Sequence, residues 1–148
     1  MTIDLGANDV LNLGPNAGAA AIAQNLPVIL AALREAAGPS VPIVGMNYYD
    51  PRLVTWFANP AGLPAEVAAA VGFNNFLEGI YALFGVPVAD VESAFMTTNT
   101  AIGPGGIPID VGIICAWTWM CVPAPVGPNI HANATGYHVI ALAFAAKL

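Results

Sequence analysis

The sequence has few positive charges. Of its 148 residues, 3 are Lys or Arg and 9 are Asp or Glu, which gives a formal net charge of −6 at pH 7. A nucleic-acid-binding protein needs a basic face for the phosphate backbone, and three cations do not make one. Charged residues make up only 8% of the chain and hydrophobic residues 57%, whereas disordered chains combine high charge with low hydrophobicity. The composition therefore excludes nucleic acid as a partner and excludes intrinsic disorder.

A long uninterrupted apolar run is also missing. A transmembrane helix is indicated by about 18 or more consecutive apolar residues, and the best candidate, residues 17–33, is interrupted by Gln24, Asn25 and Pro27. Met1 is followed directly by the strand-like residues 3–5, without the basic and apolar regions of a leader. The sequence therefore predicts no transmembrane segment and no signal peptide in this chain.

Cysteine and histidine are scarce. Cys115 and Cys121 are the only cysteines, and their separation suits a small disulfide-closed loop better than a metal or thioredoxin-type site. A disulfide would indicate an oxidising compartment, and two reduced, buried thiols are the alternative. The two histidines, His131 and His138, are too few for a metal site, and no Gly-rich phosphate loop is present. We expect no metal and no cofactor.

Short β-branched runs alternate with Ala-rich or amphipathic segments. Strands are expected at residues 2–5, 41–46 and 86–91, and helices at residues 17–37, 65–84 and from Asn133 or Thr135 to Leu148. Pro27 either kinks the first helix or starts its second half. The second helix is expected to bury Val67, Val71, Phe76, Ile80 and Phe84.

The remaining segment, residues 96–128, is expected to be a long irregular excursion, and such stretches in compact domains are usually functional. The alternation predicts one α/β domain over residues 1–148, with a parallel sheet covered on both faces. Ligands of such sheets bind outside the carboxyl ends of the strands. The polar segments 6–9 and 47–50 and the region after residue 91 lie there.

Two short segments carry polar residues at the boundaries of these elements. Gly6-Ala7-Asn8-Asp9 follows the first strand, and residues 129–137, with the sequence NIHANATGY, precede the last helix. A Gly-x-Asn-Asp string alone is usually a turn, and a single loop histidine is usually solvated. Together and in this order, the two segments resemble the third and fifth blocks of the SGNH, or GDSL-type, serine hydrolases. The middle of the chain looks like the bacterial secreted esterases and lipases of that family.

The resemblance implies a three-layer α/β/α, flavodoxin-like fold and serine-histidine acyl transfer on a carboxylic ester. Asn8 would donate a hydrogen bond to the oxyanion, and His131 would be the general base. The substrate would be a small-molecule or polymeric ester, and the location extracellular or periplasmic. His138 is expected to be structural.

The sequence departs from the family pattern in two ways. The nucleophile block and the second block are absent, so that the N-terminal strands of the fold are expected to be missing. Ser40 is expected at the amino end of the sheet, and Ser93 lies on the correct side without any sign of activation. The acid position is occupied by Asn129, which is expected to hold the wrong tautomer of the imidazole. Asp110 could replace the acid only if residues 96–128 folded back.

Two further hypotheses stay open. The chain is either a catalytically silent remnant that serves as a binding module, or one half of a site that a second chain completes. A homo-oligomer covering the exposed N-terminal strand would do the latter. The acyl pocket could be lined by aromatic side chains that could equally pack in the core, namely Tyr48, Tyr49, Trp56, Trp117 and Trp119.

Overall fold

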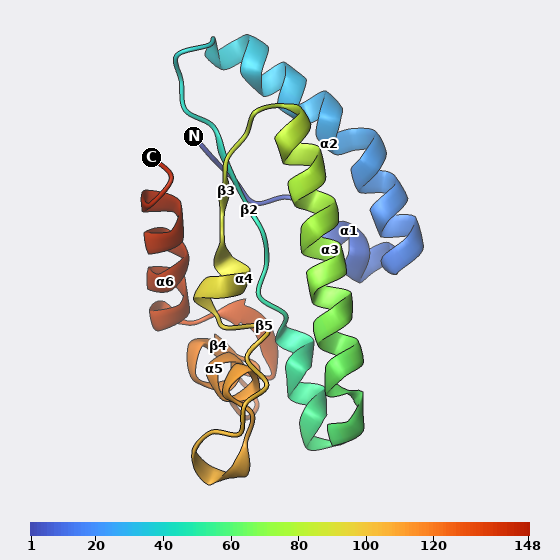
Figure 1. Cartoon of the computed structure of the whole chain (residues 1–148), viewed down its shortest axis with the longest axis vertical. Coiled ribbons are helices and arrows are strands. Elements are labelled where there is room, and N and C mark those ends of the chain that lie inside the picture. Colours follow the sequence, from blue (N-terminus) through green and yellow to red (C-terminus); the bar gives the residue numbers. More distant parts are fainter.

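The computed structural model describes residues 1–148 and has a parallel sheet at its centre (Figure 1). The strands β1 (Thr2–Ile3), β2 (Val44–Met46) and β3 (Val88–Ala89) are parallel and lie in the order β1-β2-β3. Gly45 pairs with Ile3 on one side and with Val88 on the other. The chain is therefore α/β, as the alternation of strands and helices predicts.

Helices make up most of the remaining chain. They are α1 (Ala7–Leu13), α2 (Pro15–Ala37), α3 (Leu63–Leu83), α4 (Val91–Ala94), α5 (Ile109–Trp117), α6 (Ala134–Ala145) and the 3-10 helices η1 (Pro51–Phe57), η2 (Pro60–Gly62) and η3 (Pro104–Gly106). A separate antiparallel pair joins β4 (Thr118–Trp119) to β5 (Asn129–Ala132).

The sheet has an apolar cluster on each face, because successive strand residues point to opposite sides. Ile3 and Ile43 pack with buried residues of α2 and α3, among them Leu30, Leu77 and Tyr81. On the opposite face, the buried Val44, Met46, Ala89, Phe95, Val111 and Ile114 form a second cluster, against which α6 packs. Figure 1 shows α2 and α3 on one side of the strands and α6 on the other.

Several expected boundaries are wrong. Residues 6–9 are not only a turn, because α1 begins at Ala7 and α2 follows at Pro15. Proline is well tolerated at the first helical position because its missing N–H has no partner there. Pro27 lies inside a continuous α2 and does not divide it. The strands at β1, β2 and β3 are shorter than expected.

The expected face of α3 is also partly wrong. The buried positions are Leu63, Asn74, Leu77, Ile80 and Tyr81, whereas Val67, Val71 and Phe76 are only half-buried. The buried face of α3 contains a polar residue, Asn74, and the sequence pattern therefore did not identify it as the buried face. The last helix is capped by Asn133, whose side chain accepts hydrogen bonds from the N–H groups of Thr135 and Gly136.

The segment 96–128 is not an irregular excursion. It contains η3, α5 and β4, and α5 carries three fully buried residues, Asp110, Val111 and Ile114. The sequence of α5, IDVGIICAW, is apolar on nearly all sides and therefore has little helical periodicity.

One helix, α2, is long and apolar enough to cross a membrane, with a mean hydropathy of 1.4. Length and composition alone are weak evidence, because core helices of other proteins have the same properties. The inner face of α2 packs on the sheet through Ile22, Leu26 and Leu30. The structure therefore gives no clear transmembrane segment.

Candidate functional site

A cavity of about 590 Å³ lies beyond the carboxyl ends of β1 and β2. Its walls come from residues 4–11, from residues 48–52 after β2, from one side of α3, and from β5 and α6. These are segments from both ends and the middle of the sequence. The position agrees with the rule that ligands of parallel sheets bind at the carboxyl edge.

Asn8 and His131 line this same cavity. Asn8 lies in the first turn of α1, and His131 lies on β5 with an exposed side chain. Gly6 joins β1 to α1 with φ of 120°, a conformation that side-chain-bearing residues rarely adopt. A Cβ at Gly18 would lie 2.5 Å from the Cα of Val10, so that glycine is required where α2 passes α1. These two glycines position Asn8 at the cavity.

Asn129 determines the state of the His131 ring. Its Oδ1 accepts the backbone N–H of His131 at 2.9 Å and lies 2.5 Å from the ring Nδ1. A backbone N–H can only donate, which identifies the accepting amide atom as oxygen. Nδ1 must then carry the proton, and in the neutral ring Nε2 is the free acceptor. The expectation that Asn129 holds the wrong tautomer is therefore wrong, because the amide oxygen of Asn129, and not its NH₂ group, faces the ring.

Tyr49 anchors the strand that carries His131. Its hydroxyl donates to the carbonyl oxygen of Ile130 at 2.8 Å. Its ring stacks on Phe95 with centroids 4.4 Å apart, and Phe95 in turn packs edge-on against Trp117 at 5.3 Å. Burial raises the pKa of Tyr49 to about 12. The hydroxyl therefore stays protonated and keeps donating throughout the physiological pH range.

Two buried asparagines fix the loop after β2. The side chain of Asn74 accepts the N–H of Tyr48 at 2.9 Å and donates to the carbonyl oxygen of Tyr48 at 2.8 Å. Asn47 donates to Glu78 at 2.8 Å and to Asp90 at 3.0 Å. Asn74 was not predicted from the sequence, where its only signal is that it is a polar residue within an apolar helix.

Acidic side chains dominate the charge of the cavity. Asp4, Asp9, Asp50 and Glu66 line it, together with the single arginine Arg52. Arg52 pairs with Glu66 at 3.0 Å, and the hydroxyl of Tyr48 donates to Asp4 at 2.5 Å. Burial, and then the bond to Asp4, raise the pKa of Tyr48 far above its ordinary value.

Asp50 is half-buried in this wall, where it caps η1 by accepting the N–H of Arg52 at 2.8 Å. Burial is the main cause that raises the pKa of Asp50. The carboxylate thus has a smaller preference for its charged form than an ordinary aspartate.

No serine, threonine or cysteine lines the cavity. Ser93 is exposed on α4, and its N–H donates to Asp90 at 3.0 Å. Ser40 lies between α2 and β2, at the amino end of the sheet. Asp110 is fully buried on α5, where it accepts the N–H of Val111, and does not line the cavity either. Segment 96–128 does not bring a substitute acid to His131.

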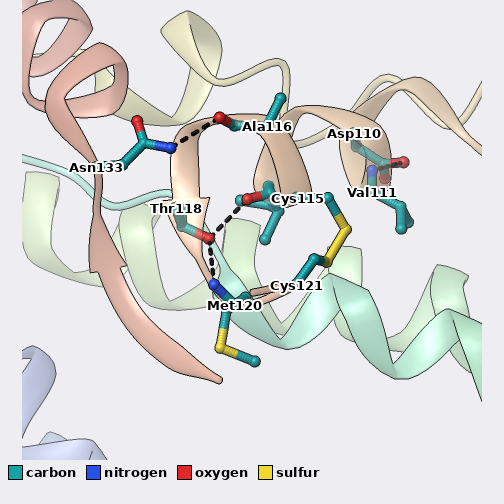
Figure 2. The surroundings of a disulfide bond; sticks show 9 residues. Asp110, Val111, Cys115, Ala116, Thr118, Met120, Cys121 and Asn133 are labelled. Carbon is teal, nitrogen blue, oxygen red and sulfur yellow. Dashed lines mark hydrogen bonds between the residues drawn. A yellow bond between two sulfur atoms is a disulfide. The ribbon is translucent and has the colours of Figure 1, made fainter. Parts of the chain in front are cut away.

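A disulfide stabilises the segment that pairs with the strand of His131. Figure 2 shows Cys115 of α5 joined to Cys121 just after β4. The hydroxyl of Thr118 donates to Ile114 at 2.6 Å and accepts the N–H of Met120 at 3.1 Å. Asn133 donates to the carbonyl oxygen of Ala116 at 2.8 Å (Figure 2). Since β4 pairs with β5, these bonds fix the position of the strand that carries His131.

The aromatic residues divide between cavity and core. Tyr48 and Tyr49 line the cavity, as does Tyr137 of α6. Trp56 lines a separate hollow beside α3, and Trp117 packs against the second apolar cluster. Trp119 lines neither hollow. His138 is exposed on α6, outside the cavity.

No group of three or more His, Cys, Asp or Glu side chains is arranged to hold a metal ion. Comparison with known proteins found no family model, no curated protein and no solved structure that matches the chain.

Proposed function

We propose that the chain is a carboxylic-ester hydrolase domain of SGNH type, whose ester substrate binds in the cavity. One observation carries the proposal: Asn8 and His131, from opposite ends of the sequence, line the same cavity at the carboxyl edge of the parallel sheet. Asn129 supports it, because its Oδ1 leaves Nε2 of His131 free to accept a proton.

In this proposal, Nε2 of His131 removes a proton from a hydroxyl as that hydroxyl attacks the ester carbonyl. The side-chain amide of Asn8 donates to the oxyanion of the tetrahedral intermediate. The imidazolium then returns the proton to the leaving alcohol as the carbon–oxygen bond breaks. Asn129 is neutral, and the carboxylates that share the cavity wall with His131 are those of Asp4, Asp9, Asp50 and Glu66.

The nucleophilic serine comes from outside the cavity lining described above. A second copy of the chain is one source, since β1 lies at the edge of the sheet with its outer side unpaired. Water replaces the serine as the nucleophile when the ester has a good leaving group. We further propose an extracellular or periplasmic location, with which the Cys115–Cys121 disulfide is compatible.

A second candidate function is a catalytically silent module that binds esters without cleaving them. The lack of any serine, threonine or cysteine in the cavity wall favours it. It differs from the first proposal only in the absence of turnover.

The test is hydrolysis of p-nitrophenyl butyrate by the purified protein and by His131→Ala. His138→Ala is the matched control, because His138 is exposed and outside the cavity. The hydrolase proposal requires turnover above the buffer rate that is lost in His131→Ala and kept in His138→Ala. Equal rates in all three proteins would contradict it. No turnover, combined with binding of the ester's acid product at the His131 signals in an NMR titration, would establish the silent module.

A further inference from the structure

One side of α3 forms a long wall of the cavity, and most of that wall is uncharged. The residues that share this side and line the cavity are Glu66, Ala69, Ala70, Phe73 and Phe76. A helix rises by about 1.5 Å per residue, so this wall is about 15 Å long. Glu66 pairs with Arg52 at one end, and the α3 residues that line the cavity beyond Glu66 carry no charge.

A second apolar wall comes from α1 and from the start of α2. Val10 and Leu11 of α1 and Pro15 of α2 line the cavity. Val10, Phe73 and Phe76 are half-buried and pack against the apolar cluster that α2 and α3 form on the sheet, and Leu11 is 50% exposed. The two walls therefore leave apolar surface facing the cavity, and burial of that surface against an apolar ligand is favourable.

This apolar surface begins next to the proposed oxyanion donor. Asn8 and Leu11 both line the cavity and are three residues apart on α1. Side chains at this spacing are neighbours on a helix, with about 5–6 Å between their Cβ atoms. An ester whose carbonyl oxygen accepts a hydrogen bond from Asn8 therefore has the side chain of Leu11 beside it.

We propose that the apolar part of the cavity is a subsite for a linear hydrocarbon chain of the ester. The inference rests on the proposed function and names its substrate class, an ester with a medium-length aliphatic chain. The chain extends from the carbonyl group at Asn8 past Leu11 and along α3 to Phe73 and Phe76. The length of the α3 wall favours a linear chain over a compact group, and the wall offers no charge for a polar one.

The experiment compares octan-1-ol with butan-1-ol in NMR titrations of the whole chain, because neither probe requires turnover. Each fully buried CH₂ group tightens binding by about fourfold. The two alcohols differ by four CH₂ groups, and with about half of that surface buried we expect octan-1-ol to bind at least about tenfold more tightly. Equal affinities, or no binding of octan-1-ol up to its solubility limit, would overturn the proposal.

The same titration locates the alcohol. The signals that move should be those of Leu11, Phe73 and Phe76. Trp56 lines the separate hollow beside α3. Shifts centred on Trp56, with those three signals unchanged, would overturn the subsite.

Leu11→Asn tests the subsite by substitution, with Leu13→Asn as its matched control. Both leucines lie on α1 and are similarly exposed, at 50% and 57%, but Leu13 does not line the cavity. Octan-1-ol should bind about threefold more weakly to Leu11→Asn and equally well to Leu13→Asn. An equal effect of the two variants would contradict the proposed location.

Two pairs of esters show which side of the ester carries the chain. A higher kcat/KM for p-nitrophenyl octanoate than for p-nitrophenyl butyrate places the chain on the acyl side. A higher kcat/KM for octyl acetate than for butyl acetate places it on the alcohol side. Turnover without a long-chain preference in either pair would overturn the subsite.

The hydrocarbon subsite and the hydrolase activity fail separately. Preferential binding of octan-1-ol without His131-dependent turnover leaves the subsite standing and removes the hydrolase proposal. His131-dependent turnover with equal binding of the two alcohols does the opposite.

Discussion

Replacing Asn129 with alanine removes the one acceptor that faces Nδ1 of His131. Oδ1 of Asn129 lies 2.5 Å from Nδ1 and accepts the backbone N–H of the same residue at 2.9 Å. The backbone pairing of β5 with β4 does not depend on this side chain. The substitution therefore changes the preferred proton position on the imidazole and leaves the strand in place.

The expected size follows from the loss of one hydrogen bond. Such a bond contributes about 1 kcal/mol, which corresponds to roughly a fivefold change in the ratio of the two neutral tautomers. Long-range ¹⁵N–¹H NMR spectra measure this ratio for each histidine at a pH where the rings are neutral. We expect the Nδ1–H form of His131 to predominate in the wild type. In Asn129→Ala, the ratio of the Nδ1–H form to the Nε2–H form should fall about fivefold.

Two controls accompany this measurement. Asn129→Asp keeps an accepting oxygen and should keep the Nδ1–H form, and His138 should have the same tautomer ratio in all three proteins. An unchanged ratio in Asn129→Ala, or a wild type in which the Nε2–H form predominates, would refute the role given to Asn129.

Three further predictions concern the scaffold. Gly18→Ala should destabilise the protein by about 1–3 kcal/mol, because the new Cβ would lie 2.5 Å from Val10 Cα; an unchanged urea midpoint would contradict this. Phe95→Ala should cost about 3–5 kcal/mol in urea unfolding, since Phe95 is fully buried between two aromatic rings; a loss below about 1 kcal/mol would show that the site collapses around the gap. Burial raises the pKa of Asp110 above its usual 3.8. The stability that this carboxyl contributes is therefore complete below pH 3.8 and is lost as the pH rises through the folded-state pKa. The difference between the Tm of Asp110→Asn and the Tm of the wild type should accordingly become more positive from pH 4 to pH 7. A constant or decreasing difference would refute the raised pKa of Asp110.

The sheet was predictable because its strands are short β-branched runs between turn residues, and buried strands of this kind need no alternating pattern. The helix α5 was not predictable, because apolar residues lie on nearly all of its sides and the sequence therefore shows no helical period. The buried face of α3 was misjudged because Asn74 lies on it, and its two bonds to Tyr48 become visible only in three dimensions.

For the site, Asn8 and His131 were selected from the resemblance of their segments to two blocks of one enzyme family, and both line the same cavity. Asp9 and Asp50 belong to the segments that were expected at the carboxyl edge, whereas Glu66 reaches the cavity only through the packing of α3, which the sequence did not predict. The tautomer of His131 depends on which amide atom of Asn129 faces the ring, and the backbone of β5 determines this.

The central claim is that Asn8 and His131 act on one ester bound in one cavity. The most direct test is the rate at which Asn8→Ala hydrolyses p-nitrophenyl butyrate, with Asn12→Ala as the matched control, because Asn12 is also exposed on α1 but does not line the cavity. Loss of an oxyanion donor should lower the rate by about 10²–10³-fold, while Asn12→Ala keeps the wild-type rate. A wild-type rate in Asn8→Ala would contradict the account.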